Sequence, residues 1–128
     1  MSPVRAAGRL DEDGILFLTG NGLFRYSRSK DTAEPFLAGD KFPPPFQGGF
    51  YRASLIPSRD RVLVVTGIAG RYNMSLISTT GPSVIFKNRQ VASPRLAFTE
   101  SGVICVTGTP GAWTVAETSL DGKSTRTL

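Results

Sequence analysis

Histidine is absent from this chain of 128 residues, and cysteine occurs once, as Cys105. Without histidine, the chain cannot supply a Ser-His-Asp or Cys-His catalytic group from its own residues. A single cysteine excludes an internal disulfide, and the missing imidazoles and thiols exclude a zinc site within one chain. We therefore expect neither metal nor cofactor. We expect Cys105 to be a small apolar residue inside a buried strand.

Long apolar runs and runs of like charge are also missing. No apolar run approaches the roughly 20 residues that span a bilayer, and Met1 to Arg5 lack the pattern of a signal peptide. We therefore expect no membrane span and favour a cytoplasmic location. Fifteen Lys and Arg against ten Asp and Glu give a net charge of +5. These cations are spread along the chain with no three in a row, so a solubilising surface is favoured over nucleic-acid binding.

A short apolar stretch that closes with Thr-Gly occurs three times, at residues 15–20, 62–67 and 103–108. The spacing is 47 residues from Thr19 to Thr66 and 41 residues from Thr66 to Thr107. A repeat of about 40–45 residues is typical of a four-stranded propeller blade. We expect each threonine hydroxyl to bond its own backbone before the glycine turn rather than to line a pore.

Alternating and apolar stretches around the three repeats predict twelve strands and no helix, because no stretch keeps a period of 3.6 residues. Asp13-Gly14 and Asp121-Gly122 are strong turn signals. Pro43-Pro44-Pro45 predicts a stiff connector, with a ligand for a proline-recognising groove as the alternative. The expected strands cover residues 5–10, 15–19, 23–29, 35–38, 50–56, 61–66, 74–79, 84–87, 94–98, 103–107, 113–120 and 124–128.

These strands group into three units of four, over residues about 2–39, 49–88 and 93–128 of one repeat domain. The third unit carries Ser93-Pro94 before its first strand, Leu120-Asp121-Gly122 in its last turn, and Arg126-Thr127-Leu128 in its last strand. It resembles the WD40-like (PD40) blade of the TolB-type β-propellers. Ser101-Gly102 departs from that pattern, which has Asp-Gly there, and the second unit has lost both turns. The resemblance implies an all-β fold and is nearly silent on function.

Three blades would form an open arc, because propellers typically close with four to eight. The two end sheets would then expose apolar faces built for a neighbour. We expect two copies to close a six-bladed ring with C2 symmetry, the first unit of one chain packing on the third unit of the other. Six blades are common in the TolB-like family. The alternative is that this half-propeller is a piece of a longer propeller chain.

In propellers, ligands usually meet the face formed by the turns between the second and third strands and by the connectors between blades. Aromatic and arginine side chains are enriched at binding hot spots. Packing of Trp113 between blades and plain solvation of Arg71 are the alternatives to binding. The candidate ligand-binding residues on that face are Asn21, Arg71, Tyr72, Asn73, Trp113 and Arg89, with Lys41, Phe42 and Gln90 beside them.

We therefore expect a non-catalytic binding or scaffold module that self-associates and presents this face to a protein or carbohydrate partner. The alternative is a propeller-type hydrolase or lyase that uses carboxylates and arginine in the channel. That alternative needs acids on the innermost strands, and residues 5–10, 50–56 and 94–98 contain none. The acids lie mostly in turns, where turn chemistry explains them.

Overall fold

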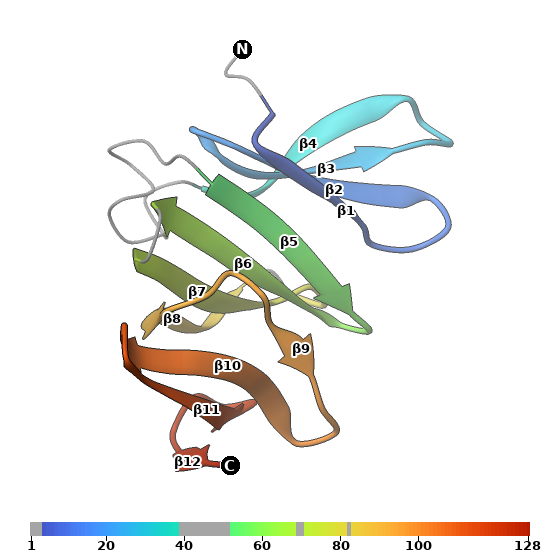
Figure 1. The fold of residues 1–128 in the computed structure, drawn as a ribbon. Coiled ribbons are helices and arrows are strands. Elements are labelled where there is room, and N and C mark those ends of the chain that lie inside the picture. Colours follow the sequence, from blue (N-terminus) through green and yellow to red (C-terminus); the bar gives the residue numbers. More distant parts are fainter. Residues whose placement is uncertain (1–3, 39–51, 69–70, 82) are drawn as a thin grey trace.

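A computed structural model describes residues 4–38, 52–68, 71–81 and 83–128 of the chain as three antiparallel sheets (Figure 1). The proline connector, Lys41 and Phe42 lie outside the described residues. No helix occurs in the described ranges, so the expected all-β fold is confirmed. Among these residues, accordingly, there is no helix that could cross a membrane.

Each sheet is a meander whose four strands follow in chain order, every neighbouring pair being antiparallel. The first sheet holds β1 (Ala6–Arg9), β2 (Gly14–Thr19), β3 (Gly22–Ser27) and β4 (Thr32–Ala38). The middle sheet holds β5 (Arg52–Ser58), β6 (Arg61–Ile68), β7 (Arg71–Ser78) and β8 (Ser83–Val91). The third sheet holds β9 (Ala97–Phe98), β10 (Gly102–Thr109), β11 (Ala112–Ser119) and β12 (Thr125–Thr127).

Every expected strand has a counterpart, but several boundaries are wrong. The strand expected at 84–87 continues to Val91, and the strand expected at 94–98 shrinks to Ala97–Phe98. The connection expected from Ile68 to Asn73 is largely strand, because β6 includes Ile68 and β7 begins at Arg71. The first of these errors has a visible cause: β8 shifts its register against β7 around Leu76, and an irregular strand hides its alternation.

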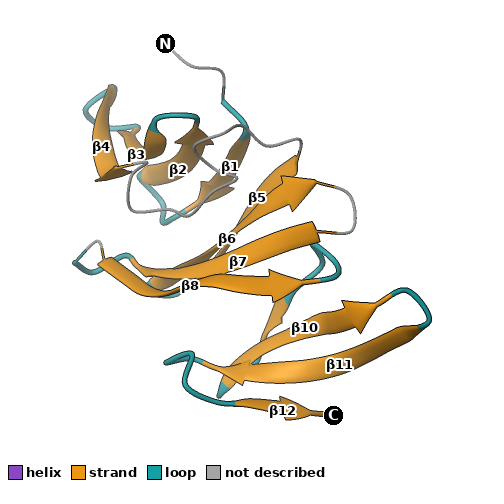
Figure 2. Cartoon of the chain, turned by 90° about the vertical axis from the view of Figure 1, so that its left-hand side faces the viewer, coloured by secondary structure: helices purple, strands orange, loops and turns teal. Residues whose placement is uncertain are grey.

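The middle sheet lies between the other two and is apolar on both faces (Figure 2). Successive strand residues point to opposite faces. On β6, Val62 and Val64 therefore join a cluster with the first sheet, whereas Leu63 and Val65 join a cluster with the third. This explains why β6 is a continuous apolar run rather than an alternating one.

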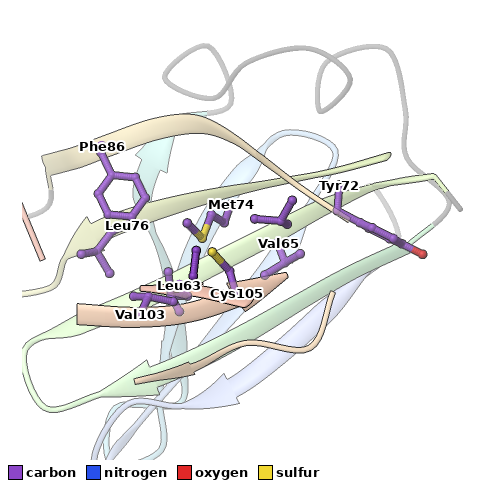
Figure 3. Close-up of a cluster of buried hydrophobic side chains, with 10 residues drawn as sticks. Leu63, Val65, Tyr72, Met74, Leu76, Phe86, Val103 and Cys105 are labelled. Carbon is purple, nitrogen blue, oxygen red and sulfur yellow. The ribbon is translucent and has the colours of Figure 1, made fainter. Parts of the chain in front are cut away.

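Two hydrophobic clusters thus hold the stack together. The first packs Leu16, Leu18 and Leu23 of the first sheet against β5, β6 and β7. The second packs Val103, Cys105 and Ala116 of the third sheet against β6, β7 and β8. Figure 3 shows Cys105 in the second cluster, so its expected role as a buried apolar residue is confirmed.

The repeated Thr-Gly has a backbone explanation in two of its three copies. Gly67 and Gly108 have φ angles of +153° and +100°, which other residues rarely adopt. A Cβ on either glycine would collide with the carbonyl oxygen of the residue four positions on, Arg71 or Ala112. In the first copy, the Thr19 hydroxyl accepts a hydrogen bond from the Asn21 amide at 3.0 Å, as expected.

Candidate functional site

The six candidate ligand-binding residues are distributed over all three sheets. Asn21 lies exposed in the β2–β3 turn, and Arg71 lies exposed at the start of β7. Asn73 is half-buried on β7, two residues further along. None of the hydrogen bonds, ion pairs or ring contacts among the described residues joins two of the six.

Arg71, Tyr72 and Asn73 were expected in a loop, and their place inside β7 corrects that expectation. Extension of β7 to Arg71 follows from its pairing with β6, in which Arg71 lies opposite Ile68 and Tyr72 opposite Gly67. Tyr72 is only 6% exposed and belongs to the second hydrophobic cluster. Figure 3 shows its hydroxyl at the far end of the ring, pointing away from the rest of the cluster.

Arg89 links the middle sheet to the third sheet. From β8, its guanidinium donates a hydrogen bond to the carbonyl oxygen of Gly122 in the turn between β11 and β12. The same guanidinium lies 6.0 Å from the centre of the Phe86 ring. Its side chain is therefore engaged in joining the middle sheet to the third.

A cleft of about 350 Å³ opens beside Tyr72, between the middle sheet and the connector that leads into the third sheet. Its apolar lining comes from Ala53, Val65, Pro94 and the Tyr72 ring. Its polar lining comes from Ser54 and Arg95. The volume lies at the small end of the range of ligand sites in proteins, about 300–1,000 Å³.

Arg95 is the residue of this cleft that sequence reasoning missed, because it was placed inside a strand. The connector that carries it is fixed at two points. The Ala92 amide donates to the Val106 carbonyl at 2.7 Å, and the Arg95 amide donates to the Ser93 hydroxyl at 3.2 Å. The Ser93-Pro94 pair that precedes Arg95 was the available signal, since proline cannot continue a paired strand.

Trp113 lies on the outer face of the third sheet, opposite the inner face that carries Cys105 and Ala116. Strand pairing sets Trp113 opposite Gly108 and Val115 opposite Val106, and residues directly opposite share a face. The Leu128 amide donates a hydrogen bond to the Val115 carbonyl oxygen at 2.9 Å, so Leu128 lies beside Val115. Three of the four exposed large apolar side chains among the described residues lie here: Trp113 at 64%, Val115 at 46% and Leu128 at 57%.

The outer face of the first sheet, at the other end of the stack, carries half-buried apolar side chains. Ile15 and Phe17 alternate with the inward-facing Leu16 and Leu18 on β2. Phe17 lies opposite Phe24, and their rings stack with centroids 5.4 Å apart. The exposed Ala7 lies opposite Phe17 on its other side. Both hydrophobic clusters of the described residues lie on the inner sides of the end sheets, so these two outer faces belong to neither.

The carboxylates of the described residues serve turns and local pairs. Thr99 and Arg126 both donate hydrogen bonds to Glu117, at 2.7 and 3.0 Å, and they lower its pKa. The Ser27 hydroxyl and the Ser29 amide likewise donate hydrogen bonds to the Asp13 carboxylate and lower its pKa. No group of three or more possible metal-ligating side chains was found in the described ranges. No protein-family model matches the chain, and a search of curated proteins found no significant match.

Proposed function

We propose that the chain is a non-catalytic binding or scaffold module. Its three sheets act as consecutive blades of a TolB-like, WD40-like propeller, and two copies close a six-bladed ring. The ring then binds a protein or carbohydrate partner through the face that carries Arg71, Tyr72 and the cleft beside Arg95. The observation that carries the proposal is the pair of apolar outer faces, one on each end sheet.

Each of these faces carries apolar and aromatic side chains beside a few charged ones, among them the Glu117–Arg126 pair on the third sheet. Isolated exposed apolar residues are normal, but contiguous apolar patches are typical of association sites. The third sheet offers Trp113, Val115 and Leu128, and the first offers the stacked Phe17 and Phe24. Aromatic residues of this kind supply much of the binding energy in protein interfaces.

Charge supports the same pairing of end sheets. The sequence from residue 4 to 38 has five Lys and Arg and five Asp and Glu, and the sequence from 92 to 128 has three of each. Both end sheets are therefore neutral overall, so their approach meets no net electrostatic repulsion. In a ring with C2 symmetry, the first sheet of each copy covers the third sheet of the other, and no apolar face remains open.

The molar mass in solution tests the ring. Light scattering should give twice the 13.7 kDa of one chain. Val115→Glu, on the outer face of the third sheet, should give a monomer that still folds and unfolds cooperatively, because Val115 is already exposed in the single chain. A wild-type chain that stays monomeric and unfolds cooperatively would remove the ring and favour a longer parent propeller.

Mixing two variants distinguishes the ring from other dimers. Ala7→Glu alters the first sheet's outer face and Val115→Glu the third sheet's. Each variant alone should be monomeric, because each disrupts both contacts of the ring. An equimolar mixture should recover a weaker dimer, because one of its two contacts joins two unaltered faces. Dimers that persist in either variant alone would instead show that like faces associate with like.

A further inference from the structure

The net charge of the chain resides entirely in its middle sheet. Residues 52–91 contain six Lys and Arg and a single acid, Asp60, a balance of +5 that equals the total for all 128 residues. The cations are spread over all three sheets, as expected, and the excess arises because residues 52–91 contain so few acids. A local excess of this size raises the concentration of anions next to the middle sheet.

The cleft beside Tyr72 lies on this basic sheet, at the end where β7 begins. It is lined by Ser54, Tyr72 and Arg95, and by no acid among the described residues. Arg95 is exposed, and its side chain donates a hydrogen bond to no described residue. Arg71 is exposed at the same end of the sheet, one residue before Tyr72. The cleft thus combines an apolar interior with an available guanidinium.

We propose that this cleft binds a small organic monocarboxylate, with its apolar body against Val65, Pro94 and the Tyr72 ring and its carboxylate on Arg95. The guanidinium fork matches a carboxylate in a bidentate geometry. Arg95 is the one cationic residue of the described lining, and pairing with a single guanidinium favours a monoanion over a phosphate dianion. A volume of about 350 Å³ suits a body of benzene or hexose size. The proposal rests on the binding function given above but not on ring closure, because one chain supplies the whole lining.

The cleft at the opposite end of the middle sheet fits an anion less well. It is larger, about 620 Å³, and it is lined by Arg59 and Arg61. However, Arg61 pairs with Asp60 at 3.3 Å, and Glu100 also lines the cleft. A carboxylate placed there would compete with Asp60 and meet the charge of Glu100.

Titration with phenylacetate, followed by amide NMR shifts, tests the proposal. We expect saturable shifts at Ser54, Tyr72 and Arg95, and binding of the neutral phenylacetamide about tenfold weaker, since it loses a charge-assisted hydrogen bond. Arg95→Gln should weaken phenylacetate binding about tenfold and leave phenylacetamide binding unchanged. Lys123→Gln removes an exposed cation from the turn between β11 and β12 and should change neither.

Three outcomes would overturn the proposal: no saturable shift in the cleft, equal affinity of phenylacetamide and phenylacetate, or an unchanged affinity in Arg95→Gln. Tighter binding of phenyl phosphate than of phenylacetate would overturn the choice of a monoanion. The same titration on the monomeric Val115→Glu variant separates this proposal from the ring. Carboxylate binding by that monomer would support the cleft, whether or not the wild-type chain dimerises.

Discussion

The Arg89 guanidinium on β8 donates a hydrogen bond to the carbonyl oxygen of Gly122, 33 residues later in the chain. The main contact between the two sheets that it joins is apolar. Gly122 is buried, and its amide also donates to the Ser119 carbonyl at 2.9 Å, closing the β11–β12 turn. One arginine therefore positions the last hairpin of the third sheet on the middle sheet.

Replacing Arg89 should weaken that contact. Arg89→Ala removes the donor and leaves the buried Gly122 carbonyl oxygen without this hydrogen bond. The free energy of unfolding should fall by about 1–3 kcal/mol. Urea unfolding followed by tryptophan fluorescence measures the loss, since Trp113 lies in the third sheet. Arg28→Ala, at an exposed site, is the control and should change stability by less than about 0.5 kcal/mol. Equal midpoints for the two variants would show that the hydrogen bond contributes nothing.

Gly122 should tolerate no side chain, for two separable reasons. Its φ of +74° is strained for other residues, and an added Cβ would lie 2.8 Å from the Phe86 side chain. Gly111 has a similar φ of +85° with nothing within 4 Å, so it isolates the backbone term. Gly111→Ala should cost about 1 kcal/mol, and Gly122→Ala about 1–3 kcal/mol more, from overpacking. Equal costs in urea unfolding would mean that Phe86 moves aside freely.

The number and order of the strands could be predicted from the sequence because each element carries its own local signal. Asp13-Gly14 and the alternation of β11 depend on neighbouring residues alone, and both led to strands where the structure has them. Local chemistry is sufficient for such features because hairpins bring together residues that are close in sequence. The two-sided burial of β6 was not readable, because β2 and β10 carry the same unbroken apolar run but are buried on one face only.

The candidate site could not be predicted to the same degree. Arg89 looked like a solvent-facing connector residue, and its partner Gly122 lies in a turn that sequence reasoning treated only as a hairpin signal. Tyr72 was expected in the connection from Ile68 to Asn73, but pairing with Gly67 extends β7 over it. Contacts of this kind depend on how sheets stack, and no local pattern encodes that arrangement.

The stability of the third sheet should depend on pH through Glu117. Hydrogen bonds from Thr99 and then Arg126 lower its pKa in the folded chain below the ordinary value of about 4.3. A lowered pKa means that the folded state binds fewer protons. The stabilisation is therefore complete above the unfolded pKa and is lost as the pH falls through the folded one.

Glu117→Gln should therefore be less stable than the wild type at pH 7, and the difference should shrink below about pH 4. Thermal unfolding from pH 7 to pH 3 measures both curves. Glu100→Gln, an exposed acid in the neighbouring turn, serves as the control for loss of one charge. A Glu117→Gln curve parallel to that of the wild type at every pH would show that this carboxylate does not link folding to protons.

Cys105 should report the opening of the second cluster. Burial raises the pKa of its thiol, and its side chain is 1% exposed. The thiol is therefore both inaccessible and protonated at neutral pH, so a disulfide reagent should label it only when the third sheet separates from the middle sheet. Labelling should be slower, on the order of a thousandfold or more, than in a Cys105→Ser/Ser29→Cys variant, whose thiol is exposed.

Because Arg89 holds the two sheets together, Arg89→Ala should accelerate labelling of Cys105 and leave the exposed thiol unaffected. Fast labelling of the wild type would show that the third sheet opens independently of global unfolding.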